Sequence, residues 1–126
     1  MTLNFDCVFY YVSDLDRSVS FYRDVLGLRL VSRDMVARFD VDGVLVELVP
    51  KHWSERYEGK GNARLCLRVD HLNAAINDLL RLGVVSSEPS DKGPGLLASI
   101  HDLDGNEICL WQYKRTAPGP GTSIWQ

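Results

Sequence analysis

Apolar residues recur at helical spacing across residues 12–28, VSDLDRSVSFYRDVLGL. The residues three or four positions apart are Leu15, Val19, Tyr22 and Leu26. This period places them on one face of an amphipathic helix. Ser13 or Asp14 can supply the N-cap oxygen, and Gly27 is a typical C-terminal stop. The pattern therefore predicts a helix that packs one apolar face against another element.

Strand-like segments flank this helix. In residues 4–12, alternation places Cys7, Phe9 and Tyr11 on one face and the intervening valines and Tyr10 on the other. Three further segments are rich in β-branched or apolar residues and are expected to complete an antiparallel sheet with the helix on one face. They are residues 28–32, 35–40 and 44–49.

The same order of patterns returns in the second half of the chain. Val69 lies 57 positions after Val12 and begins a matching helical pattern, which predicts a helix over 72–82 that stops at Gly83. Later in each half, an Asp-Gly turn precedes a strand that contains Glu47 or, 62 positions on, Cys109. The predicted second-half strands are residues 64–69, 84–86, 97–102 and 107–112.

We therefore predict an α+β fold, a tandem duplication of a β-α-β-β-β module within a single domain of residues 1–126. The modules are expected over 4–50 and 63–112, with a linker at 51–62 and a Pro/Gly-rich tail at 113–126. Each module leaves one sheet face without a helix. Two such faces can enclose a common cleft, which is where a ligand is expected to bind.

Composition excludes several classes of partner. The net charge is −3 and no stripe of Lys or Arg is present, which argues against nucleic acid. No apolar run approaches the roughly 20 residues that a membrane-spanning helix needs. Three cysteines without a signal peptide favour reduced thiols and a cytoplasmic location.

Three segments resemble the vicinal oxygen chelate superfamily, which includes glyoxalase I, the bleomycin-resistance proteins and the extradiol dioxygenases. They are VSDLDRSVSFYRDVLGL at 12–28, VELV at 46–49 and HDLDGNEICLW at 101–111. The resemblance covers about residues 4–112 and implies a cupped mixed sheet around a central cleft, and a homodimer. It does not assign an activity, because this fold supports lyases, epimerases, dioxygenases, thiol transferases and drug binders.

Metal-dependent members of the superfamily take ligands, usually His and Glu, from four inward-facing strand positions. The residues at the matching positions are Cys7, Glu47, Arg64 and Cys109. One carboxylate is too few for Mg²⁺ or Mn²⁺, and a guanidinium cannot act as a ligand. We therefore expect no metal cofactor. Arg64 is expected to take the place of the metal's charge, either by pairing with Glu47 or by binding a carboxylate or phosphate of the ligand.

Other roles for these residues stay open. Cys7, Glu47 and Cys109 form an alternative ligand set for one divalent metal such as zinc. Arg64 is also a candidate to lower a neighbouring thiol's pKa and so create a nucleophile. His101 has the alternation parity of a cleft residue and is a candidate acid or base, although a turn hydrogen bond explains its position equally well.

Aromatic side chains favour binding of a flat or apolar molecule. The candidates are Phe9, Tyr11, Phe39 and Trp111, with Trp53 or Tyr57 from the linker. Arg38, Arg68 and Glu107 are candidate polar anchors, and simple filling of the core is the alternative for any single aromatic residue.

The leading hypothesis is a metal-free protein that binds a small organic molecule, with sequestration of a toxic compound as the model. A second hypothesis is a metal-dependent lyase or dioxygenase with an altered metal site. A third is a metal-free lyase or isomerase that uses Glu47 or His101 as its base.

Overall fold

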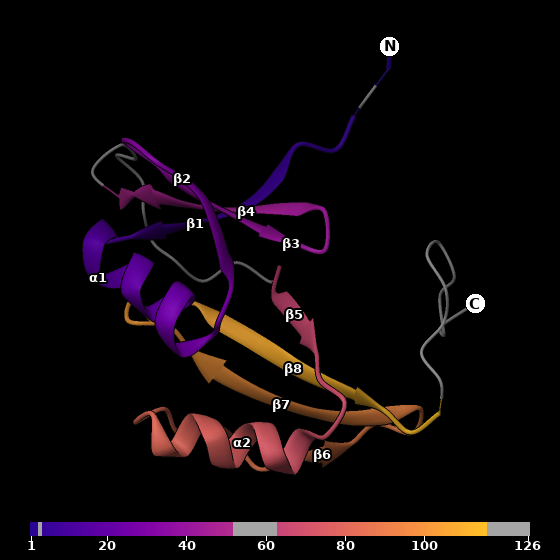
Figure 1. Cartoon of the computed structure of the whole chain (residues 1–126). Helices are drawn as coiled ribbons and strands as arrows, with labels where there is room; N and C mark the ends of the chain where they lie inside the picture. Colours follow the sequence, from indigo (N-terminus) through magenta and orange to yellow (C-terminus); the bar gives the residue numbers. More distant parts are fainter. Residues whose placement is uncertain (3, 52–62, 116–126) are drawn as a thin grey trace. The chain divides into compact units, whose positions relative to one another are not determined.

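The computed structural model describes residues 1–2, 4–51 and 63–115. The chain divides into two compact units, Met1–Asn62 with Asp102–Asn106, and Ala63–His101 with Glu107–Gln126. Each unit contains one four-stranded sheet, so the fold is α+β as predicted (Figure 1). Most of the expected linker and tail lie outside the described residues, and the single-domain boundaries remain predictions.

The first unit is a β-α-β-β-β module with mixed strand directions. Its elements are β1 (Cys7–Val12), α1 (Leu15–Ser20), the π-helical turn η1 (Phe21–Val25), β2 (Arg29–Arg33), β3 (Ala37–Val41) and β4 (Val44–Pro50). The strand order is β1-β4-β3-β2. β1 is parallel to β4, whereas the other two pairs are antiparallel. The sheet is therefore mixed, because the connection through α1 returns the chain so that β2 runs in the same direction as β1.

The first helix forms where the periodicity predicts it. The Asp14 carboxylate caps it by accepting a hydrogen bond from the Arg17 amide at 3.1 Å, and Gly27 follows at a φ of 72°. Val19 and Tyr22 are buried, with 6% and 0% exposure. The last turn is π-helical, which the apolar spacing did not predict, because Leu26 donates to the Phe21 carbonyl five residues earlier.

The second unit repeats this connectivity. Its elements are β5 (Leu65–Arg68), α2 (Leu72–Arg81), β6 (Ser90–Asp91), β7 (Gly95–His101) and β8 (Glu107–Tyr113). The strand order is β5-β8-β7-β6, with β5 parallel to β8. The matching order of the two sheets agrees with the internal repeat. Figure 1 shows α2 along one side of its own sheet, where Leu72, Ile100 and Ile108 are completely buried.

The strand predicted at 84–86 is wrong. Ser87 contacts β7 instead through two isolated bonds, because its amide donates to the Ser99 carbonyl and its Oγ accepts the Ser99 amide, both at 2.9 Å. A side-chain oxygen thus replaces the backbone carbonyl that a regular strand would present. The short edge strand forms later, at Ser90–Asp91.

The turn Asp102–Asn106 belongs to the first unit although it lies in the second half of the sequence. The buried Tyr22 hydroxyl donates to Asp102 Oδ2 at 2.8 Å. Asn106 Nδ2 donates to the Tyr11 carbonyl at 3.2 Å, and the Ser13 amide donates to Asp104 Oδ1 at 2.9 Å. These bonds attach the Asp102–Asn106 turn to the first helix and to the end of β1, with Asp102 buried.

Neither α-helix in the described ranges is long and apolar enough to span a membrane.

Candidate functional site

Each sheet has a helix-free face, which we define as the face opposite its packed helix. In the first unit, Val46 and Leu48 are buried toward the helix, so Glu47 between them projects from the helix-free face. In the second unit, Ile108 and Leu110 are buried in the same way, and Cys109 projects between them. The alternation predicted from the sequence is therefore confirmed for these two residues.

The Glu47 carboxylate is compensated within its own sheet. Its side chain is only 15% exposed, and its Oε1 lies 3.6 Å from Arg38 Nε. The two residues are register partners on β3 and β4. Arg38 also donates to Ser32 Oγ and Asp34 Oδ2, each at 3.3 Å. Arg38, which the sequence suggested only as a rim anchor, is thus an ion-pair partner of Glu47.

Cys7 lies close to two carboxylates. Ligand atoms of Asp6, Cys7 and Glu47 all fall within 4.8 Å of one another. Burial, followed by the Glu47 hydrogen bond and charge, raises the pKa of the Cys7 thiol from 9.0 to about 11. Cys7 is therefore a protonated thiol at neutral pH and a poor nucleophile.

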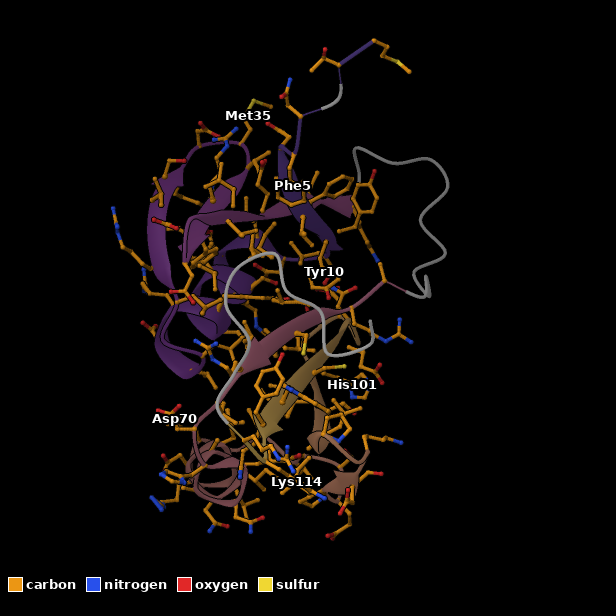
Figure 2. All side chains as sticks on the ribbon, turned by 90° about the vertical axis from the view of Figure 1, so that its right-hand side faces the viewer. Phe5, Tyr10, Met35, Asp70, His101 and Lys114 are labelled. Carbon is orange, nitrogen blue, oxygen red and sulfur yellow. The ribbon has the colours of Figure 1, made fainter. Side chains whose placement is uncertain are left out.

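Arg64 is also paired within its own unit. Its Nε donates to Glu107 Oε2, and one terminal nitrogen donates to the Ala63 carbonyl at 3.2 Å. His101, the last residue of β7 (Figure 2), places Nε2 3.9 Å from the other Glu107 oxygen. Glu107 therefore lies between a guanidinium and an imidazole on the helix-free face of the second sheet.

The two remaining cysteines are neighbours. Cys66 on β5 and Cys109 on β8 are register partners. Burial and then Glu107 raise the pKa of Cys109, and the opposing effect of Arg64 is smaller. Burial also raises the pKa of Cys66. The hypothesis that Arg64 activates a neighbouring thiol is therefore not supported, because burial outweighs the guanidinium.

Two aromatic pairs lie on the helix-free faces. Phe9 and Tyr11 meet edge to face at 5.3 Å in the first unit, and Phe9 is 48% exposed. Trp111 and Tyr113 meet in the same way at 5.6 Å in the second unit. Arg68 is exposed at the end of β5 and is the register partner of Trp111. The ring geometry is favourable in both pairs, and an exposed ring edge can contact a ligand.

The Trp111 indole lies directly over the Gly95 backbone. A Cβ added to Gly95 would be 2.5 Å from Trp111 Cζ2 and 2.9 Å from Cε2, which is closer than such atoms can approach. Gly95 thus permits the position of this indole. Sequence reasoning treated the glycine only as part of a turn, and only the strand register reveals the contact.

The expectation for Phe39 is wrong. Its side chain is completely buried and its ring lies 5.9 Å from the Tyr22 ring, on the helix side of the sheet. Alternation along β3 explains the error, because Arg38 and Asp40 take the helix-free face. Trp53 and Tyr57 lie outside the described residues.

The donor set fits a resident divalent metal poorly. Of the four positions at which the resemblance implies metal ligands, the one held by Arg64 offers no ligand atom. Glu47 is compensated by Arg38. Asp6 adds a carboxylate beside Cys7 and Glu47, but it is exposed. These contacts favour ion pairing over metal ligation.

Comparison with known proteins gives consistent matches. The model of the Glyoxalase/Bleomycin resistance protein/Dioxygenase superfamily matches residues 4–110. A lactoylglutathione lyase of Haemophilus influenzae is 30% identical over 125 residues, which cover 87% of this chain and 93% of the relative.

Two solved structures show the same fold. A lactoylglutathione lyase from Agrobacterium tumefaciens has a TM-score of 0.73 at 19% identity and covers 86% of this chain and 92% of its own. An antibiotic binding protein from Streptomyces sp. CB03234 has a TM-score of 0.73 at 24% identity, covering 90% and 100%.

Proposed function

The chain belongs to the glyoxalase/bleomycin resistance protein/dioxygenase superfamily, and on that premise we propose that it binds a small organic molecule without a resident divalent metal. The observation that carries the proposal is Arg64. It occupies one of the four ligand positions of metal-dependent members and is paired with Glu107. A permanent cation at such a position repels a metal and attracts an anionic ligand group.

The helix-free faces supply the other binding groups in this proposal. Phe9 and Tyr11 offer aromatic edges on one sheet, and Trp111 does so on the other. Cys7, Glu47 and Cys109 add small or polar contacts, and Arg68 adds a second cation. Within the second unit, an aromatic ligand with a carboxylate or phosphate matches the combination of Trp111 with Arg64 and Arg68. The antibiotic binding protein of the same fold supports a binding role for such faces.

The cellular role that we propose is sequestration of a toxic compound. Sequestration of a toxic compound requires tight binding and no turnover. We propose that the protein performs this role in the cytoplasm as a homodimer. Light scattering after size-exclusion chromatography tests the assembly, because a mass near twice the chain mass of 14.2 kDa is expected.

Arg64→Ala provides the direct test of the proposed function. A thermal-shift screen against small aromatic carboxylates and phosphates is expected to identify ligands that raise the melting temperature of the native protein. Arg64→Ala is expected to abolish these shifts, because the anionic group loses its guanidinium partner.

Arg81→Ala is the matched control for that experiment. Arg81 forms an exposed pair with Asp78 on α2, so its removal leaves the helix-free face unchanged. The proposal is wrong if Arg64→Ala keeps the ligand-induced shifts, or if Arg81→Ala loses them to the same extent.

A metal-dependent lyase is the second candidate function. The grouping of Asp6, Cys7 and Glu47 favours it, as does the lyase activity named for the Haemophilus influenzae relative. In this case Glu47 would be required for turnover, either as a ligand or as the base, and His101 is the other candidate base. Turnover of S-lactoylglutathione in the presence of added Zn²⁺, with loss of activity in Glu47→Gln, would support this candidate over the binding role.

A further inference from the structure

The cysteine pair of the second unit has a defined geometry. Cys66 and Cys109 are register partners across the parallel strands β5 and β8. Their neighbours Leu65 and Ile108 are buried toward the helix, so both thiols project from the helix-free face. Cys66 is exposed and Cys109 is partly exposed, and both are free thiols. A small ligand can therefore reach two adjacent sulfurs.

The spacing between β5 and β8 indicates which kind of link the two thiols can form. Neighbouring strands lie about 4.7–4.9 Å apart, and side chains stand roughly perpendicular to the sheet, so the two sulfurs inherit a similar separation. A disulfide needs Cβ atoms about 3.5–4.5 Å apart, slightly closer than the spacing of neighbouring strands. With metal–sulfur bonds of about 2.3 Å, a metal between two opposed thiolates holds them about 4.6 Å apart.

We propose that Cys66 and Cys109 form a two-coordinate site for a soft monovalent metal ion of the Cu(I) type. Thiolates are the ligands that Cu(I) prefers. In the described part of the chain, no third His, Cys, Asp or Glu side chain joins these two sulfurs in a compact ligand group. Tetrahedral zinc would need two further ligands, whereas a linear ion needs none.

Positively charged side chains near the two cysteines favour a complex of two thiolates with one monovalent ion. Two thiolates and one monovalent cation carry a net charge of −1. Arg64 and Arg68 precede and follow Cys66 by two positions, and the Arg64 charge is close enough to act on Cys109. Glu107 opposes this effect, but Arg64 pairs with it directly. Arg68 is exposed two positions after Cys66 on the same face of β5, and its positive charge offsets the negative charge of the complex.

This site goes beyond the proposed binding of an organic molecule. It depends on Cys66, which lies at none of the four ligand positions of metal-dependent members. It also requires neither Glu47 nor an aromatic ligand, so the two proposals can fail separately.

Anaerobic titration tests the site. The fully reduced protein is titrated with Cu(I) in competition with the chromophoric chelator bicinchoninate. One tightly bound Cu(I) per chain is expected. Cys66→Ser and Cys109→Ser are each expected to lose this binding, because a single thiolate cannot complete the linear pair.

Cys7→Ser is the matched control, since Cys7 lies in the first unit beside Glu47. It is expected to bind Cu(I) like the native protein. Circular dichroism and melting temperature verify that each variant folds. The proposal is overturned if Cys66→Ser still binds Cu(I) tightly, if Cys7→Ser loses the ion, or if Zn²⁺ occupies the pair as tightly as Cu(I).

Discussion

Glu47 and Arg64 each have an oppositely charged partner in their own sheet. Glu47 lies beside Arg38, and Arg64 is bonded to Glu107. Alternation in the sequence places Glu47, Arg64 and Glu107 on helix-free faces, whereas Arg38 was expected only as a rim anchor. It does not give the register between strands, and register decides which cation lies opposite which carboxylate. The predicted pairing of Arg64 with Glu47 rested on a family position, whereas the observed pairs follow from neighbouring strands.

The Cys7 thiol provides a prediction at this scale. Its pKa is raised to about 11, with Glu47 as the main charged cause. Glu47→Gln is expected to lower this pKa and to accelerate alkylation of Cys7 by iodoacetamide at pH 8 several-fold. Peptide mass spectrometry distinguishes Cys7 from the other cysteines. Asp40→Asn, on the same face of β3, should leave the rate unchanged, and an unchanged rate in Glu47→Gln would contradict the assignment.

The raised pKa of Cys7 also predicts how the stability of the folded protein depends on pH. The folded pKa lies above the ordinary value of 9.0, so the folded protein retains a proton that the unfolded chain has lost. The contribution of Cys7 to stability is therefore complete below about pH 9 and falls as the pH rises toward 11. Glu47→Gln should reduce this loss of stability between about pH 9 and pH 11, because the carboxylate that helps to raise the Cys7 pKa is removed.

The helices are the elements that the sequence predicts best. The first begins at Asp14, one of the two predicted caps, and the second spans Leu72–Arg81 within one residue of its expected end. Errors occur where side chains replace backbone bonds, as at Ser87. The π-helical turn was missed for a related reason, because apolar spacing alone does not distinguish a bond to the fourth residue from one to the fifth.

The bond from Tyr22 to Asp102 connects the first helix to the Asp102–Asn106 turn. Tyr22→Phe is expected to lower the free energy of unfolding by about 1–3 kcal/mol, because the buried Asp102 Oδ2 loses one of its two donors and keeps only Asn106 Nδ2. Urea denaturation measures the change. Tyr113→Phe is the control, since its ring contact with Trp111 does not involve the hydroxyl. Equal effects of the two variants would contradict the role assigned to this bond.

Gly95 provides the second prediction for an element. Gly95→Ala is expected to cost about 1–3 kcal/mol, because the methyl group overlaps both the Gln112 carbonyl oxygen and the Trp111 indole on β8. The indole N–H signal of Trp111 in a heteronuclear NMR spectrum should shift as the ring is displaced. A variant with native stability and an unmoved indole signal would show that Gly95 does not position Trp111.

At the scale of the whole molecule, duplication is the main organising feature. Both modules have the same strand order and a parallel pair between their first and last strands. The sequence indicated the duplication because shifts of 57 and 62 positions relate the same order of elements in the two halves. The halves have diverged in chemistry, however, because Cys7 and Glu47 correspond to Arg64 and Cys109. A repeat thus predicts where side chains project but not which reaction they support.

The account as a whole depends on the absence of a resident divalent metal. Elemental analysis of protein purified without chelator, after incubation with excess zinc, iron, nickel or manganese and then desalting, tests this most directly. Copper is quantified separately, because the paired cysteines bind it independently. The account predicts far less than one divalent ion per chain. About one such ion per chain, lost in Glu47→Gln, would contradict it and establish Glu47 as part of a metal centre.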